Sequence, residues 1–388
     1  MSTLKSAQID IYLYDSGNPP STPQYSLSKN LLSGESTINF EISELIKDYV
    51  EIDFRGDYEN ALISKLVDVE ITRTFTETCT NGTEVTHTET GNRLKYIAFR
   101  GYGEMEDKNL YEDSPYYDKN VNPTLSKDML ISNTKIYHLK GEPIRIPFYN
   151  GNDGVHKVQY KNDVTTVSSV ILGGSTDRVT VDRDDVKADV DTGASQIYTA
   201  DMTHVRLNNS TDTSREELEF NEVNTINFVT HKGFDVSYPI ELIEECKHTP
   251  YKITFINKFG ALQDLWFFKK RTDQFDVSRE GYNKTLLSTN SSGVDFNRFA
   301  HTSSLLEVNS TESITLNTGF ISEDHNEVIR QLMVTEFCWI NEKNSIGLEP
   351  VPVKPKTSSF TIKSEVNDKL INFEVEFEYA NTYMQNVR

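Results

Sequence analysis

The densest group of side chains that could bind a metal is a run of five aspartates: Asp182, Asp184, Asp185, Asp189 and Asp191. Carboxylate oxygens are the ligands that Ca²⁺ prefers in proteins. The run does not match the EF-hand loop, because the glycine and the closing glutamate are misplaced. We interpret the segment as a solvated acidic loop, with calcium binding as the alternative, and predict no metal site and no cofactor.

A second group with potential chemistry is the aromatic run Trp266, Phe267 and Phe268. Large aromatic rings can stack on a ligand such as a sugar, but they are also the largest apolar groups available to a core. Because consecutive side chains of a strand point to opposite faces, at least one of these rings must enter the core. The run therefore favours a core or a subunit contact over a carbohydrate platform.

Motifs of known catalytic sites do not occur in the sequence. The eight histidines are scattered, and no HExxH, GxSxG or GxxxxGK[ST] pattern is found. Cys79, Cys246 and Cys338 are too far apart for a CxxC metal site, and we expect reduced thiols, with one disulfide as the alternative. A polysaccharide-degrading enzyme needs a carboxylate pair, and 59 acidic residues are too many to single one out. We predict no catalytic residues and no enzymatic activity.

Charge and hydropathy narrow the classes of partner. The chain has 388 residues and a formal net charge of −20, which repels phosphate and argues against direct nucleic-acid binding. No stretch approaches the roughly 18 apolar residues of a membrane span, so we expect no membrane partner. The sequence begins MSTLK without a signal-peptide pattern, and we expect that it is not exported by that route.

Strand patterns dominate the elements that must position any site. Ile9, Ile11 and Leu13 alternate with polar residues, which predicts a strand over residues 7–14, and Asn81-Gly82 predicts a hairpin turn. The last strand has the clearest period of two, with glutamates on one face and apolar residues on the other: Ile371, Phe373, Val375, Phe377 and Tyr379.

Only two short helices are expected. Residues 40–50 carry four apolar side chains at helical spacing: Ile42, Leu45, Ile46 and Tyr49. Residues 325–333 predict the second helix, with Val328, Ile329 and Leu332 facing inward. Both are too short to build a helical core.

These patterns predict a mainly β protein made of several β-sandwich modules, Ig-like or jelly-roll-like, with a few short helices. The length suggests two or three domains. We expect an N-terminal β domain over 1–140 with its helix near 42–50, an inserted or middle β module over 141–240, and a C-terminal β domain over 241–388. The middle range is set apart by its shorter strands and its Asp, Thr and Ser content.

Two segments are candidates for contact with other subunits. Tyr111, Tyr116 and Tyr117 lie in a polar stretch, and tyrosine is favoured at interfaces; an ordinary loop is the alternative. Pro350, Pro352 and Pro355 exclude a helix and fit an edge strand or an extended arm that reaches a neighbour.

Three segments resemble uncharacterised structural proteins of tailed bacteriophages, especially those that are marine or infect Bacteroidetes. They are FEISELIKDY (40–49), ITFINKFG (253–260) followed by LWFF (265–268), and ITLNTG (314–319) together with the glutamate-rich last strand. They bracket nearly the whole chain but fill a small part of it.

The resemblance implies a virion protein, made in the bacterial host cytoplasm and built into the tail, neck or baseplate. Its expected partners are other virion proteins and further copies of itself in a ring. The alternative is a carbohydrate-binding or receptor-binding adhesive module of a tail fibre, although neither repeats nor a coiled-coil segment are visible.

Overall fold

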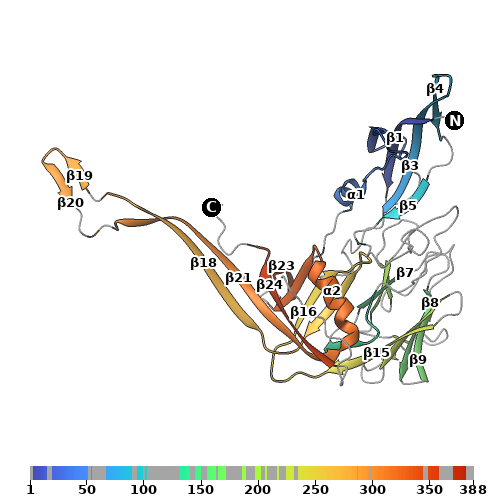
Figure 1. Cartoon of the computed structure of the whole chain (residues 1–388). Coiled ribbons are helices and arrows are strands. Elements are labelled where there is room, and N and C mark those ends of the chain that lie inside the picture. Colours follow the sequence, from blue (N-terminus) through green and yellow to red (C-terminus); the bar gives the residue numbers. More distant parts are fainter. Residues whose placement is uncertain are drawn as a thin grey trace.

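The computed structural model describes residues 3–14, 20–50, 54, 67–89, 94–98, 101–102, 131–139, 145–149, 155–162, 165–171, 186–188, 197–201, 206–207, 216–217, 224–230, 235–285, 287–296, 299, 301–343, 348–357 and 370–381. The protein is mainly β, as predicted, with antiparallel pairing in nearly all of its sheets. Figure 1 shows an N-terminal sheet, a central body of sheets covered by a helix, and a long β-ribbon that leaves this body.

The N-terminal sheet is formed by β1 (Thr3–Tyr14), β2 (Tyr25–Asn30), β3 (Val67–Thr78), β4 (Glu84–Thr88) and β5 (Leu94–Ala98). The strand order is β2-β1-β3-β4, with β5 also paired to β3. The predicted turn at Asn81-Gly82 joins β3 to β4, and Gly82 has a φ of 80°, which glycine adopts without strain. The predicted strand over residues 7–14 is confirmed within β1.

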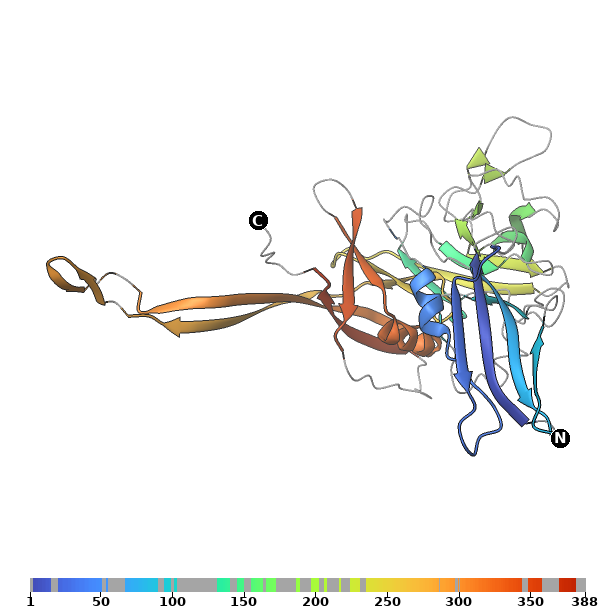
Figure 2. The same cartoon turned by 90° about the horizontal axis from the view of Figure 1, so that it is seen from above.

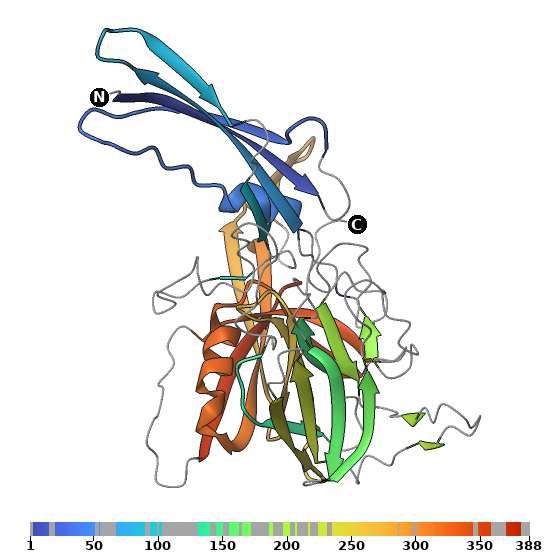
Figure 3. The same cartoon turned by 90° about the vertical axis from the view of Figure 1, so that its right-hand side faces the viewer.

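One face of this sheet is apolar and packs against α1 (Ser43–Tyr49) (Figure 3). Ile9, Ile11 and Leu13 of β1 are buried there, as their alternation predicts. The apolar side of α1, including Leu45 and Ile46, contacts this cluster. The helix predicted near residues 42–50 is therefore confirmed, and it covers the face of the sheet that the sequence marks as apolar.

The middle of the chain forms three sheets. A five-stranded sheet has the order β6-β15-β14-β8-β9, a three-stranded sheet has the order β10-β11-β7, and β12 pairs with β13. The bounds are β6 Ile136–Leu139, β7 Arg145–Tyr149, β8 Val155–Asn162, β9 Thr165–Ile171, β10 Val186–Ala188, β11 Ile197–Asp201, β12 Arg206–Leu207, β13 Glu216–Glu217, β14 Thr225–Thr230 and β15 Asp235–Ile243.

The C-terminal sheet has seven strands in the order β17-β16-β22-β23-β24-β21-β18. Their bounds are β16 Tyr251–Ile256, β17 Leu262–Phe267, β18 Thr272–Asn283, β21 Ser303–Ser322, β22 Cys338–Lys343, β23 Leu348–Pro355 and β24 Leu370–Tyr379. A separate hairpin is formed by β19 (Leu287–Asn290) and β20 (Gly293–Phe296). A 3₁₀ turn, η2 (Glu323–His325), leads into α2 (Asn326–Val334).

The largest hydrophobic cluster among the described residues lies between the C-terminal sheet and α2 (Figure 3). The predicted face of β24 is confirmed: Ile371, Phe373, Val375 and Phe377 are buried and Tyr379 is half-buried. Val328, Ile329 and Leu332 of α2 are buried against them, also as predicted. The aromatic rings of Phe267 and Phe377 meet edge to face at 5.9 Å, a favoured geometry.

The domain boundaries predicted at 140/141 and 240/241 stay predictions. One strand that lies before the first boundary nevertheless pairs with a strand that lies after it. β6, which lies before residue 141, pairs in parallel with β15 and so belongs to the five-stranded middle sheet. A parallel pair needs a long crossover, and a local sequence pattern carries no signal for such a distant partner. No helix in the described ranges has the length and apolar character to cross a membrane.

Candidate assembly interface

A two-stranded ribbon leaves the C-terminal sheet and extends far from the body (Figures 1 and 2). β18 and β21 pair from Thr272–Thr315 out to Asn283–Ser303. β24 pairs with β21 only from Ser313 to Ser322, so further out β18 and β21 have only each other as strand partners among the described residues. We name residues 275–312 the arm; at about 3.3 Å per residue, its β21 half alone spans about 33 Å.

Apolar side chains lie on both faces of the arm. Phe275, Val277 and Val308 lie on one face together with Arg279, Ser310 and Glu312, and Leu305 joins this face beyond a bulge at Glu280/Gly281. The other face is polar near the base of the arm and carries Tyr282 beyond the bulge. No other element of the described chain covers either face.

Large hydrophobic side chains of the arm are exposed. The described residues include twelve such exposed side chains, and seven of them belong to the arm: Phe275, Tyr282, Leu287, Val294, Phe299, Leu305 and Leu306. A two-stranded hairpin is marginally stable alone in water, and clustered exposed apolar groups mark interaction sites. The arm thus has the properties of a segment that another molecule covers.

The tip of the arm is a tight hairpin. β19 and β20 are joined at Asn290–Gly293 through the two-residue turn Ser291-Ser292, and Gly293 has a φ of 125°, which only glycine adopts readily. The register places Leu287 and Val294 on the same face of this hairpin. Their side chains are 59% and 70% exposed, so the tip presents an aliphatic pair to solvent.

The base of the arm is held by charged and aromatic contacts. The Arg271 guanidinium lies 4.9 Å from the centre of the Tyr251 ring and donates a hydrogen bond to the Tyr379 hydroxyl at 3.1 Å. The Lys269 ammonium donates to Glu245 at 2.8 Å, and Lys356 reaches Glu376 at 2.9 Å and Asp276 at 3.9 Å. These contacts lie where the arm joins the body.

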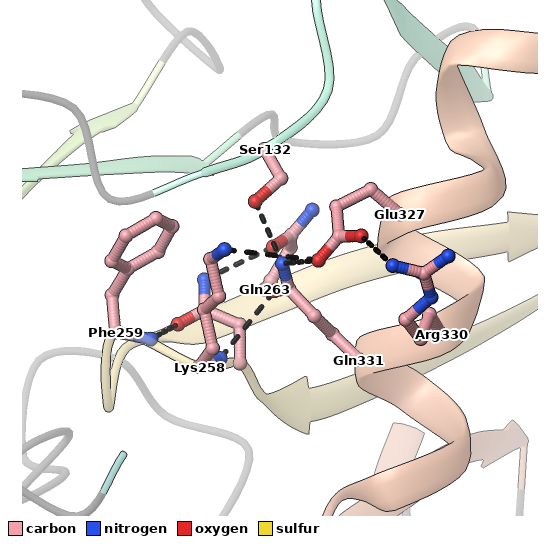
Figure 4. A network of polar contacts seen from close by, with 8 residues as sticks. Ser132, Lys258, Phe259, Gln263, Glu327, Arg330 and Gln331 are labelled. Carbon is pink, nitrogen blue, oxygen red and sulfur yellow. Dashed lines mark hydrogen bonds and ion pairs between the residues drawn. The ribbon is translucent and has the colours of Figure 1, made fainter. Parts of the chain in front are cut away.

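A polar network between α2 and the turn after β16 is the second candidate for a functional site (Figure 4). Gln331 is fully buried, and its amide donates to Ser132 Oγ at 2.7 Å and to Glu327 Oε1 at 2.9 Å. Glu327 also pairs with Arg330 at 3.2 Å and with Lys258 at 3.8 Å. The network contains one carboxylate between two cations and joins α2 to residues 131–139 and to the turn after β16, so we interpret it as a structural joint.

The aromatic run at 266–268 is core. Trp266, Phe267 and Phe268 are all buried, so they offer no platform to a sugar. Trp266 Nε1 donates to His138 Nδ1 at 3.1 Å, which joins the C-terminal sheet to β6. Cys79, Cys246 and Cys338 are free thiols, and burial raises the pKa of Cys338 to about 12, so this thiol stays protonated.

The predicted contact residues have different outcomes. Tyr111, Tyr116 and Tyr117 lie outside the described residues. Pro350, Pro352 and Pro355 lie in β23, which pairs with β22 from Leu348 to Val353 and with β24 from Val353 to Pro355. The segment is therefore a strand of the sheet and not a free arm, because each of its residues has a partner in a neighbouring strand. Its role as a subunit contact stays a prediction.

The predicted acidic loop, Asp182 to Asp191, lies almost wholly outside the described residues, and its calcium alternative stays untested. Within the described ranges, His, Cys, Asp and Glu side chains nowhere gather in threes around a possible metal position.

The arm was missed by pattern reasoning. Its strands are exposed on both faces, so apolar and polar residues do not alternate along β18, whose side chains are almost all exposed. The available signal is a different one: 26 residues from Gly281 to Leu306 that contain eight large apolar residues and no glutamate, in a chain with 59 acidic residues.

Comparisons with protein-family models, with curated proteins and with solved structures find no match for this chain.

Proposed function

We propose that this chain is a structural subunit of a tailed-bacteriophage virion, built into the tail, neck or baseplate, and that the arm joins it to neighbouring proteins. The observation that carries the assembly role is the arm, a long β-ribbon with exposed apolar side chains on a well-packed body. The placement in a phage particle rests on the resemblance of residues 40–49, 253–268 and 314–319 to phage structural proteins.

In the described chain, the arm has unpaired strand edges and exposed apolar area, and both favour contact with another molecule. The outer edges of both arm strands have no strand partner in the described chain, and such edges bind other strands readily. Covering the exposed side chains removes apolar area from water, which stabilises an assembly by roughly 25 cal/mol per Å² before the costs of association. An arm that projects from its own body can make this gain only on another molecule.

The test is to locate the protein in purified particles and to repeat this with an arm-shortened variant. In that variant, Asn-Gly replaces residues 278–309, so that Val277 and Ser310 flank a two-residue turn. We expect the intact chain in the particles and the shortened chain, folded, outside them. Absence of the intact chain from particles, with polysaccharide hydrolysis by a soluble monomer, would contradict the proposal.

Carbohydrate binding is the second candidate, and a groove on the N-terminal sheet favours it. This groove of about 340 Å³ lies opposite α1 and is lined by Lys29, Ala7 and a majority of neutral polar residues: Ser6, Gln8, Ser28, Asn30, Thr74, Thr76 and Thr86. Hydroxyl and amide groups match the hydrogen-bonding groups of sugars. Binding of the intact protein to a glycan panel, lost in Gln8→Ala, would support this candidate; no binding to any glycan would remove it.

A further inference from the structure

The outer part of the arm, Gly281 to Leu306, which includes the hairpin at its tip, differs in charge from the rest of the chain. Between Gly281 and Leu306, Lys284 and Arg298 outnumber Asp295, so this segment carries +1. The whole chain carries −20, and the other 362 residues therefore carry −21. The tip is also the part with the aliphatic pair Leu287 and Val294 exposed. A surface that receives it should be apolar at its centre and acidic at its rim.

The body offers such a surface at the opposite end of β21. Phe320 is 70% exposed and Leu370 is 43% exposed. The register pairs Phe320 with Asn372 and Ser322 with Leu370, so both apolar side chains lie on the outer face of the sheet, diagonal to each other. Glu374 is exposed on this same face, and the exposed Asp324 lies two residues beyond the end of β21. The stem of Lys269 lies against Gly319 beside Phe320, with its ammonium paired to Glu245. We name Phe320 and Leu370 the outer patch.

A bulge in β21 turns Phe320 outward. Between Asn317 and Phe320 the strand contains one residue more than β24, and Gly319 has a φ of 76° there. Thr318 is buried and its hydroxyl accepts a hydrogen bond from Phe373 N at 3.1 Å, which holds the irregularity. Without the extra residue, Phe320 would point to the core and Ile321 to solvent. The bulge thus interrupts the regular strand and leaves the Phe320 ring exposed to solvent.

We propose that the tip of one copy docks on the outer patch of a second copy, an inference that rests on the proposed assembly role of the arm. Leu287 and Val294 would be buried against Phe320 and Leu370, with Lys284 near Glu374. β21 runs from Ser303 at its tip end to Phe320 of the patch over about 56 Å of strand, so a copy cannot reach its own patch. The contact is therefore head to tail, and it closes a ring or builds a filament.

The test uses two variants that each break one side of the contact. The tip variant carries Leu287→Ser and Val294→Ser; the patch variant carries Phe320→Ser and Leu370→Ser. All four side chains are exposed, so both variants should fold, which circular dichroism and thermal melting check. Leu32→Ser, at a 67% exposed position on the N-terminal part, is the matched control and should assemble like the intact chain.

Sedimentation should show oligomers for the intact chain and monomers of about 44.3 kDa for each variant alone. An equimolar mixture of the two variants should give a one-to-one dimer and nothing larger, because one intact tip meets one intact patch. Oligomers of the patch variant, or no dimer in the mixture, would overturn the inference. So would arm-dependent binding to vesicles of phosphatidylcholine and phosphatidylglycerol in place of self-association.

Failure of this inference and failure of the proposed function give different results. If the intact chain stays monomeric but enters particles only with its arm, then the arm binds a different virion protein and only the present inference is wrong. If the arm-shortened chain enters particles as well as the intact chain does, the proposed role of the arm itself is wrong.

Discussion

The two halves of β21 are both extended strand, but one half is packed in the core and the other is exposed to solvent. In the body half, Ser313–Ser322, β24 flanks the strand, β18 also pairs with it as far as Thr315, and α2 covers one face, so Ile314 and Leu316 are fully buried. In the arm half, residues 303–312, β18 is the strand partner, and Leu305 and Leu306 are 58% and 71% exposed. The comparison separates two tasks: the covered face of the body half stabilises the fold, and the arm half is available to other molecules.

This division predicts which substitutions affect folding and which affect assembly. A core-facing residue in the body half should change the free energy of unfolding and leave the contact chemistry of the arm intact. A residue in the arm half should do the reverse. The predictions below run from the largest expected change in stability to the smallest.

Leu316→Ala should lower the free energy of unfolding by about 2–5 kcal/mol, because it removes a fully buried side chain from the main core. Chemical denaturation of the purified chain measures this. A change below about 1 kcal/mol would show that the body half is not the packed partner in the comparison.

Acid should loosen the body half at its end, where His325 lies buried with its ring 5.2 Å from that of Tyr137. Burial lowers the pKa of His325 from 6.5 to about 4, partly offset by nearby Asp324. Between these two values the unfolded chain binds the proton and the folded chain does not. Stability is therefore complete above about pH 6.5 and falls as the pH drops toward 4, by up to about 3 kcal/mol.

The control for this acid effect is His325→Gln, which removes the titrating group. Its unfolding free energy should fall less than that of the intact chain between pH 7 and pH 4.5. Parallel pH profiles for the two proteins would assign the acid sensitivity to other groups.

Gln331→Ala should cost about 1–3 kcal/mol, because Ser132 and Glu327 lose the amide that joins them behind α2. Arg330→Ala is the matched control on the same helix. Its side chain is 49% exposed, and its ion pair with Glu327 should contribute no more than about 1 kcal/mol. Equal losses in the two variants would argue against the network as the joint that holds α2 on the body half.

Leu305→Ala should change the free energy of unfolding by less than about 0.5 kcal/mol, since the side chain is exposed in the free protein. Leu305→Ala and Leu316→Ala make the same change of side chain on the same strand, so the difference between them measures the effect of burial. Assembly, measured by sedimentation, should weaken in Leu305→Ala. A large loss of stability with unchanged assembly would reverse the roles assigned to the two halves.

The sheets of the body could be predicted from the sequence, because burial of one face of a strand makes apolar and polar residues alternate along it. β24 shows this most clearly: Phe373, Val375 and Phe377 are buried, and Asn372 and Glu374 are exposed. The turn at Asn81-Gly82 and both helices follow from equally local rules. Each of these features depends on residues within a few positions of each other.

The arm and the outer patch could not be predicted in this way. An arm strand has no buried face inside its own chain, so nothing imposes alternation on Phe275 to Asn283. The exposure of Phe320 depends on a one-residue bulge against β24, which lies more than fifty residues further along the chain. Composition carries the remaining signal, since the tip is apolar and weakly basic in an acidic chain.

The most direct test of the arm's role is hydrogen–deuterium exchange of β21 in the free chain and in its purified assembly. In the free chain, amides of residues 303–312 should exchange faster than those of residues 313–322, because no element of the described chain covers a face of the arm half. On assembly, exchange at 303–312 should slow strongly while exchange at 313–317, which lies before the outer patch at Phe320, stays unchanged. Equal exchange at 303–312 in both states would contradict the account, since the arm would then remain uncovered.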